Sequence, residues 1–279
     1  MARFRYVVCD VFTSEPLAGN QVAVFTDARG IPEEQLQPLA REMNYSETTF
    51  VYPPRADGHV FMRIFTPTAE IRFAGHPTLG TAFVLAGPLQ LIEIRIETLQ
   101  ETVPVVVERE GARIVFGRMQ QPLPTIEPFE RADELLAVLG VQSQLPVELY
   151  DNGLRHVYVA LGSTAEVVAL EPEMQQLAAF GAYTVNCFAG EGLTWKTRMF
   201  APGLGVSEDP ATGSAAGPLA LHLARHGRIE FGDEIEISQG AEIGRPSILY
   251  ARADGAADAV ERIEVGGSAV IVARGEFSI

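Results

Sequence analysis

Apolar, mostly β-branched runs separated by polar turns recur along this chain, and helical stretches are fewer. The clearest runs cover residues 6–8, 21–25, 103–107, 113–116 and 269–273. Such runs are typical of β-strands. We therefore expect strands to dominate, with helices in the minority, which is an α+β protein.

Five segments have the length and the start signals of helices. They are residues 32–43, 77–85, 131–139, 172–179 and 214–226. The first has Pro32 at an opening position and two glutamates near the positive end of the helix dipole. Pro38 falls in its interior, and we expect a kink or break there.

Two stretches resemble each other. Residues 75–82 read GHPTLGTA and residues 209–216 read DPATGSAA, and an apolar run of helical character follows each. The similarity suggests an internal duplication. Because a helix start presents unpaired N–H groups and a positive dipole, two such starts facing one cleft would bind a small carboxylate.

A chain of 279 residues exceeds one typical core, so two domains of roughly 100–150 residues are expected. The QPLP sequence at residues 121–124 continues neither a strand nor a helix easily, and is the candidate linker. We expect one domain at residues 1–124 with 267–279, and the other at residues 125–266.

Composition excludes several classes of protein. The net charge of −15 disfavours nucleic-acid and anionic-membrane partners, which bind clustered Lys and Arg. No apolar stretch has the length of a membrane helix, and the first apolar run is too short for a signal peptide, so a cytoplasmic location is expected. Cys9 and Cys187 cannot form a disulfide framework, and we interpret both as small buried hydrophobic residues.

Glu47 is a candidate acid/base, because it stands between a predicted helix end and an apolar, β-branched strand. Desolvation there would raise its pKa toward neutrality. The alternative is a glutamate at the rim of a turn. His76, between Gly75 and Pro77 at a predicted helix start, should be neutral and available for hydrogen bonds, or should simply cap the helix.

The second helix start offers a similar set. Asp209 is either a functional carboxylate or an N-terminal cap. Gly213 and Ser214 offer backbone N–H groups to a carboxylate, or else allow close helix packing. His222 and His226 have helical spacing but lack the glutamate of a zinc-protease helix, so we interpret them as helix-surface residues and predict no metal site.

The motifs and their order resemble those of the PhzF family of phenazine biosynthesis. They comprise residues 44–50, 65–67, 73–82 and 209–216. The similarity extends through residues 152–157, 186–190, 198–200, 223–226 and 242–247, and so covers nearly the whole chain.

The resemblance implies the diaminopimelate-epimerase-like fold, with two similar domains, each a mostly antiparallel β-barrel around a central helix, and the active site between them. The paired cysteines of the epimerases have no counterpart beside Gly75 or Gly213, where Ala74 and Pro210 stand. Thiol-based racemisation is therefore disfavoured.

For activity, the resemblance implies isomerisation of trans-2,3-dihydro-3-hydroxyanthranilate to an amino-ketone by a homodimer without a cofactor. Glu47 would move the proton from C3 to C1. The other roles carried over are Gly213 and Ser214 for the substrate carboxylate, His76 and Asp209 for its amino and hydroxyl groups, and Asn20, Ser46 and Gly75 for the remaining contacts. Two alternatives stay open: an isomerase or epimerase of another small amino or hydroxy acid, and a non-catalytic ligand sensor.

Overall fold

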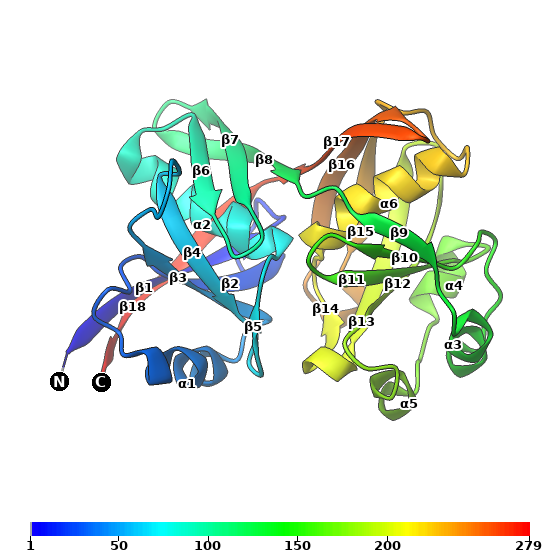
Figure 1. Ribbon diagram of the computed structural model, residues 1–279, viewed down its shortest axis with the longest axis horizontal. Helices are drawn as coiled ribbons and strands as arrows, with labels where there is room; N and C mark the ends of the chain where they lie inside the picture. The colour runs from blue at the N-terminus through cyan, green and yellow to red at the C-terminus, as the bar shows by residue number, and fades with distance from the viewer. Residues whose placement is uncertain (1) are drawn as a thin grey trace. The chain divides into compact units, whose positions relative to one another are not determined.

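The structure of the protein is a computed structural model that describes residues 2–279. The chain forms two compact units, which Figure 1 shows with a strand-rich body and an internal helix in each. Unit 1 comprises Met1–Gln120 and Gly266–Ile279, and unit 2 comprises Gln121–Val265.

In the part of the chain that the structure describes, eleven helices and strands lie in unit 1, apart from the last residue of β8. They are β1 (Arg3–Val11), β2 (Asn20–Phe25), α1 (Glu33–Met43), β3 (Glu47–Tyr52), β4 (Val60–Phe65), β5 (Glu70–Ile71), α2 (Gly75–Leu89), β6 (Glu93–Glu97), β7 (Thr102–Glu110), β8 (Arg113–Gln121) and β18 (Ala269–Ser278). β18 runs antiparallel to β1, so the end of the chain returns to the first strand.

Unit 2 contains nearly all of the remaining elements. They are β9 (Thr125–Pro128), α3 (Ala132–Leu139), β10 (Glu148–Asp151), β11 (Arg155–Ala160), α4 (Thr164–Val168), α5 (Met174–Ala178), β12 (Thr184–Glu191), β13 (Thr194–Ala201), β14 (Val206–Asp209), α6 (Gly213–Arg225), β15 (Glu234–Gln239), β16 (Ser247–Ala256) and β17 (Ala259–Gly267), with short 3₁₀ turns at Pro202–Leu204 and Ala241–Ile243.

The same order of strand pairings occurs in both units. In unit 1, β1 and β2 are antiparallel, β2 and β3 parallel, β3 and β4 antiparallel, β4 and β6 parallel, and β6 and β7 antiparallel. In unit 2, β10, β11, β12, β13, β15 and β16 follow one another with the same alternation. The long helix precedes the fifth of these strands in each unit, α2 before β6 and α6 before β15. This repeated topology supports the internal duplication expected from the two similar sequence stretches.

The helix α2 is the centre of unit 1. It packs against β1, β2, β3, β6, β7 and β18, strands from both ends of the hydrogen-bonded series, so the strands curl around it. All residues from Gly75 to Val84 are buried. A helix that is buried on every side is a core helix rather than an amphipathic surface helix.

Several helix predictions need correction. α1 does not break at Pro38, because the helix continues to Met43 while Leu36, Leu39 and Ala40 hold it against the unit. α2 starts earlier and ends later than predicted, and it accommodates Pro88 in its last turn. α4 was not predicted; its five residues are too few for a periodic signal, although Ser163 caps it by accepting from the Glu166 amide.

Both cysteines are fully buried and unbridged, which confirms the interpretation of Cys9 and Cys187 as buried hydrophobic residues. Among the described residues, no helix is long and apolar enough to cross a membrane.

Candidate active site

Unit 1 brings Glu47 and His76 together. Glu47 is the first residue of β3, which pairs in parallel with β2, and its side chain is 13% exposed. His76 is the second residue of α2 and is buried. His76 Nε2 lies 3.4 Å from Glu47 Oε2. The two candidates thus form one carboxylate–imidazole pair, from a strand start and a helix start.

His76 is held as a neutral side chain of defined orientation. Its Nδ1 lies 3.2 Å from Asn20 Nδ2, an amide nitrogen that can only donate, so Nδ1 accepts and Nε2 carries the proton. That proton is donated to the Gln21 carbonyl oxygen at 3.2 Å, and the 3.4 Å approach to Glu47 Oε2 is a close contact rather than a hydrogen bond. Burial lowers the pKa of His76 to about 3, against a smaller opposing effect of the Gln21 carbonyl. Its contact with Glu47 is therefore one between a neutral imidazole and a carboxyl group, not an ion pair.

The other candidates of unit 1 lie beside this pair in the chain. Asn20 begins β2 and is fully buried, Ser46 immediately precedes β3, and Gly75 begins α2. His76 does not cap its helix, because the N-cap position belongs to Ala74. The structure thus replaces the capping alternative with a hydrogen-bonded histidine anchored through Asn20 and Gln21.

In unit 2, Asp209 ends β14 and is buried. Its Oδ2 accepts from the Thr212 hydroxyl at 2.7 Å. Gln239, on β15, donates through Nε2 to the Asp209 carbonyl at 2.8 Å and accepts at Oε1 from the Thr212 amide at 3.0 Å. The N-cap residue of α6 is Thr212, three positions beyond Asp209. A buried polar network therefore fixes the segment that enters α6.

Gly213 and Ser214 are the first two residues of α6. The amide of Thr212 is satisfied by Gln239, and the amide of Ala215 donates to the Thr212 carbonyl at 3.0 Å. Within residues 2–279, the amides of Gly213 and Ser214 have no protein acceptor. Two adjacent amides at the positive end of a 13-residue helix can bind an anion.

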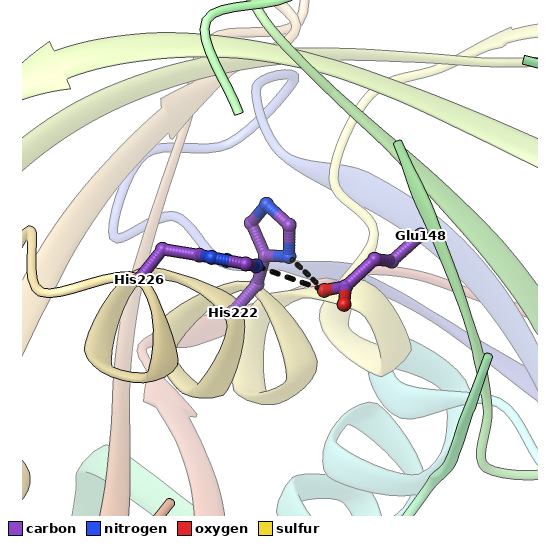
Figure 2. Close-up of side chains that lie close together, drawn as sticks. All are labelled: Glu148, His222 and His226. Carbon is purple, nitrogen blue, oxygen red and sulfur yellow. Dashed lines mark hydrogen bonds and ion pairs between the residues drawn. The ribbon is translucent and has the colours of Figure 1, made fainter. Parts of the chain in front are cut away.

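A second polar cluster joins the far end of α6 to β10 (Figure 2). Glu148 Oε2 accepts from His222 Nδ1 at 3.1 Å, His226 Nε2 at 3.0 Å and an Arg225 nitrogen at 3.1 Å. Burial would raise the pKa of Glu148, but these donors outweigh it and lower the pKa to about 2. His222 is fully buried, so its interpretation as a helix-surface residue is wrong.

Glu148, His222 and His226 offer three ligand atoms within 4.8 Å of one another, a set that could hold a metal ion. Arg225 opposes this use, because its guanidinium already bonds to Glu148 Oε2 and, at 2.7 Å, to the Tyr150 hydroxyl. A cation would have to displace another cation from the same carboxylate oxygen. The arrangement is therefore better described as a buried ion-pair network that ties α6 to its neighbouring strand.

Fold and side chains together are those of a two-domain α+β enzyme of the diaminopimelate-epimerase-like type. Burial raises the pKa of both cysteines to about 12, so neither supplies the reactive thiolate of a cysteine-based racemase. The model of the "Phenazine biosynthesis-like protein" family matches residues 9–275. The chain belongs to this family, as the sequence motifs predicted.

The relatives agree. The chain is 53% identical to the trans-2,3-dihydro-3-hydroxyanthranilate isomerase of Pseudomonas aeruginosa, over 97% of this chain and 98% of that protein. It is 52% identical to the isomerase of the same name from Pseudomonas chlororaphis, over 97% and 98%. The Bacillus anthracis crystal structure of a PhzF-family phenazine biosynthesis protein superposes with a TM-score of 0.85 at 25% identity, over all of both chains. The protein is accordingly an isomerase of the PhzF family, with the predicted fold.

Sequence reasoning missed four residues that hold the candidate site in place. They are Gln21, Gln121, Asn152 and Gln239. Three of them donate side-chain hydrogen bonds to backbone carbonyl groups far away in the sequence, and Gln21 bonds through its own carbonyl to the His76 ring. The sequence motifs do not show these contacts. One signal was present for Asn152: Pro218 lies four residues after Ser214, and a proline inside a helix leaves the carbonyl four positions earlier without its N–H donor.

Proposed function

We propose that this protein converts trans-2,3-dihydro-3-hydroxyanthranilate to an amino-ketone of phenazine biosynthesis by moving one proton. Glu47 removes the proton from C3, and the electron pair shifts through the conjugated diene. The same carboxyl group returns the proton to C1, which gives an enol that tautomerises to the ketone. The observation that carries the proposal is the identity of 52–53%, over 97% of this chain, to isomerases named for this substrate.

The contacts of Glu47 support its role as the base. The His76 ring lies 3.4 Å from Glu47 Oε2, and the burial of His76 keeps it from titrating near neutral pH. Because the imidazole is neutral, it forms no ion pair that would weaken Glu47 as a base. Because one group both removes and returns the proton, the reaction needs no second base and, in this proposal, no cofactor.

Each polar group of the substrate is assigned to residues that can form hydrogen bonds with it. We propose that the free amides of Gly213 and Ser214 bind the substrate carboxylate, where helix N–H groups also stabilise charge that develops during proton removal. His76 and Asp209 would bind the amino and hydroxyl groups, and Asn20, Ser46 and Gly75 would complete the contacts. A homodimer is expected from the same family resemblance.

The test compares the wild type with Glu47→Gln and with Glu42→Gln, an exposed glutamate on α1 that serves as the matched control. Each protein is incubated with the dihydro-hydroxyanthranilate, while diene absorbance and the proton spectrum are followed. Removing the base should lower kcat by about 10²–10⁴-fold, with little change in substrate binding.

Substrate deuterated at C3 adds a second readout, since the proposal predicts a primary isotope effect and deuterium at C1 of the product. Wild-type rates for Glu47→Gln would exclude Glu47 as the base. A folded wild type that leaves the diene intact would instead move the activity to another small amino or hydroxy acid.

A further inference from the structure

Three successive carbonyl groups in the first turn of α6 accept side-chain hydrogen bonds. The bonds are Gln121 Nε2 to Gly213 O at 2.9 Å, Asn152 Nδ2 to Ser214 O at 2.9 Å, and the Tyr158 hydroxyl to Ala215 O at 2.6 Å. The donors come from the end of β8, the turn after β10, and β11. The turn is thus held from three separate segments of unit 2.

Pro218 explains why Ser214 needs such a donor. In a regular helix the N–H of residue 218 would donate to the carbonyl of residue 214, and proline has no N–H. Asn152 supplies the missing donor from outside the helix. Asn152 and Ser214 are 1% and 2% exposed, so water is largely kept from the carbonyl that Asn152 serves.

A glycine at position 217 leaves room for the neighbouring donor, Gln121. A Cβ atom at Gly217 would lie 2.1 Å from Gln121 Oε1, so a larger residue would push the Gln121 amide from its place against the helix. The far end of α6 is fixed independently, through Glu148 and the two histidines of Figure 2. The loss of one first-turn contact should therefore alter the helix start without releasing the whole helix.

We infer that Asn152 is a positioning residue for substrate binding, which acts by holding Ser214 so that the free amides of Gly213 and Ser214 keep the direction an anion requires. This inference rests on the proposed function, because it takes these amides as the carboxylate site. Hydrogen bonds from two amides are strongly directional, so a small rotation of the first turn weakens both. Asn152 itself need not touch the substrate.

The first variant is Asn152→Leu, which keeps the size of the side chain but removes the donor. The second is Asn152→Leu combined with Pro218→Ala, which returns a backbone N–H to the Ser214 carbonyl. The control is Asn186→Leu, another asparagine that is 2% exposed in unit 2, whose amide donates to the carbonyls of Val157 and Thr184 instead of α6.

Each variant is assayed for kcat and KM with the diene substrate, for Kd of 3-hydroxyanthranilate by calorimetry, and for Tm. Losing one buried hydrogen-bond donor should raise KM and Kd about tenfold for Asn152→Leu, with kcat within about twofold. The added Pro218→Ala change should restore most of this loss. Asn186→Leu should lower Tm while leaving KM and Kd unchanged.

A lower Tm with unchanged KM and Kd in Asn152→Leu would overturn the inference and leave Asn152 a structural residue. If that variant does not fold, Asn152→Ser, which admits water to the Ser214 carbonyl, provides the same comparison. The wild type could bind 3-hydroxyanthranilate yet leave the diene intact, while Asn152→Leu binds the same compound more weakly. That result would refute the proposed substrate and keep the inference. A wild type that neither binds nor reacts would refute both.

Discussion

Buried histidines should make unit 2 sensitive to mild acid, and His156 offers the clearest test. Its side chain is fully buried on β11, its Nδ1 bonds to Thr184 Oγ1 at 2.6 Å, and its Nε2 has no hydrogen-bond partner among the described residues. Burial lowers the pKa of His156 to about 3, from 6.5 for an unperturbed histidine. Protonating it inside the fold would place an uncompensated charge in the core.

The sign of the effect follows from the two pKa values. Between pH 6.5 and about 3 the unfolded chain binds a proton at His156 and the folded chain does not, so stability falls as pH falls. Above pH 6.5 the contribution is constant. At pH 5 the loss is about 2 kcal/mol, since each pH unit below the unfolded pKa costs about 1.4 kcal/mol.

The assay is urea unfolding at several pH values between 4.5 and 8, followed by the fluorescence of Trp195. This is the single tryptophan of the chain, and it is buried on β13 of unit 2. His156→Gln removes the titrating group. Its plot of unfolding free energy against pH should be shallower than that of the wild type by about 1.4 kcal/mol per pH unit below pH 6.

Thr184→Val is the matched control, because it deletes the hydrogen-bond partner of His156 and keeps the imidazole. It should lose stability at every pH while its slope stays at least as steep as that of the wild type. Equal slopes for the wild type and His156→Gln would refute the reasoning, because they would mean that His156 takes up no proton on unfolding.

Two further predictions concern packing and charge. In α2, a Cβ on Gly80 would lie 2.6 Å from Val22 Cγ1, whereas one on Gly87 would meet nothing within 4 Å. Gly80→Ala should therefore lower the free energy of unfolding by about 1–3 kcal/mol. Gly87→Ala should raise it by about 0.5–1 kcal/mol. Equal Tm shifts of the two variants in thermal melts would contradict the close approach at Gly80. The Arg198 and Glu208 side chains are each 9% exposed and bond at 2.8 Å. Arg198→Met should cost about 3–5 kcal/mol by leaving a buried charge unpaired, and adding Glu208→Gln should recover part of it; a double variant no better than the single one would count against that cause.

The sequence predicted what local patterns encode. Runs of β-branched residues marked strands of unit 1, and the similar stretches before residues 83 and 217 marked the two central helices. His222 shows the limit of this approach. Its polar character and spacing suggested a helix surface, whereas in the structure Glu148 and Tyr150 from β10 cover it, and strand β10 lies more than seventy residues earlier in the chain.

Pro38 and Pro218 show that the effect of a helical proline depends on its surroundings. Pro38 lies in the second turn of α1, where the apolar face formed by Leu36 and Leu39 still packs against the unit and keeps the helix continuous. Packing of an apolar face can outweigh one missing hydrogen bond. Break predictions from proline alone therefore fail wherever burial is strong.

Pro218 lies deeper in the fold, where a missing donor is costlier, and there a distant side chain replaces it. An interior proline in a buried helix thus predicts more than a possible kink: it predicts an external donor for the carbonyl four residues earlier. In this chain that carbonyl belongs to Ser214, one of the two residues proposed to bind the substrate carboxylate. The proline that weakens the helix locally is therefore the reason why Asn152 controls the geometry of its first turn.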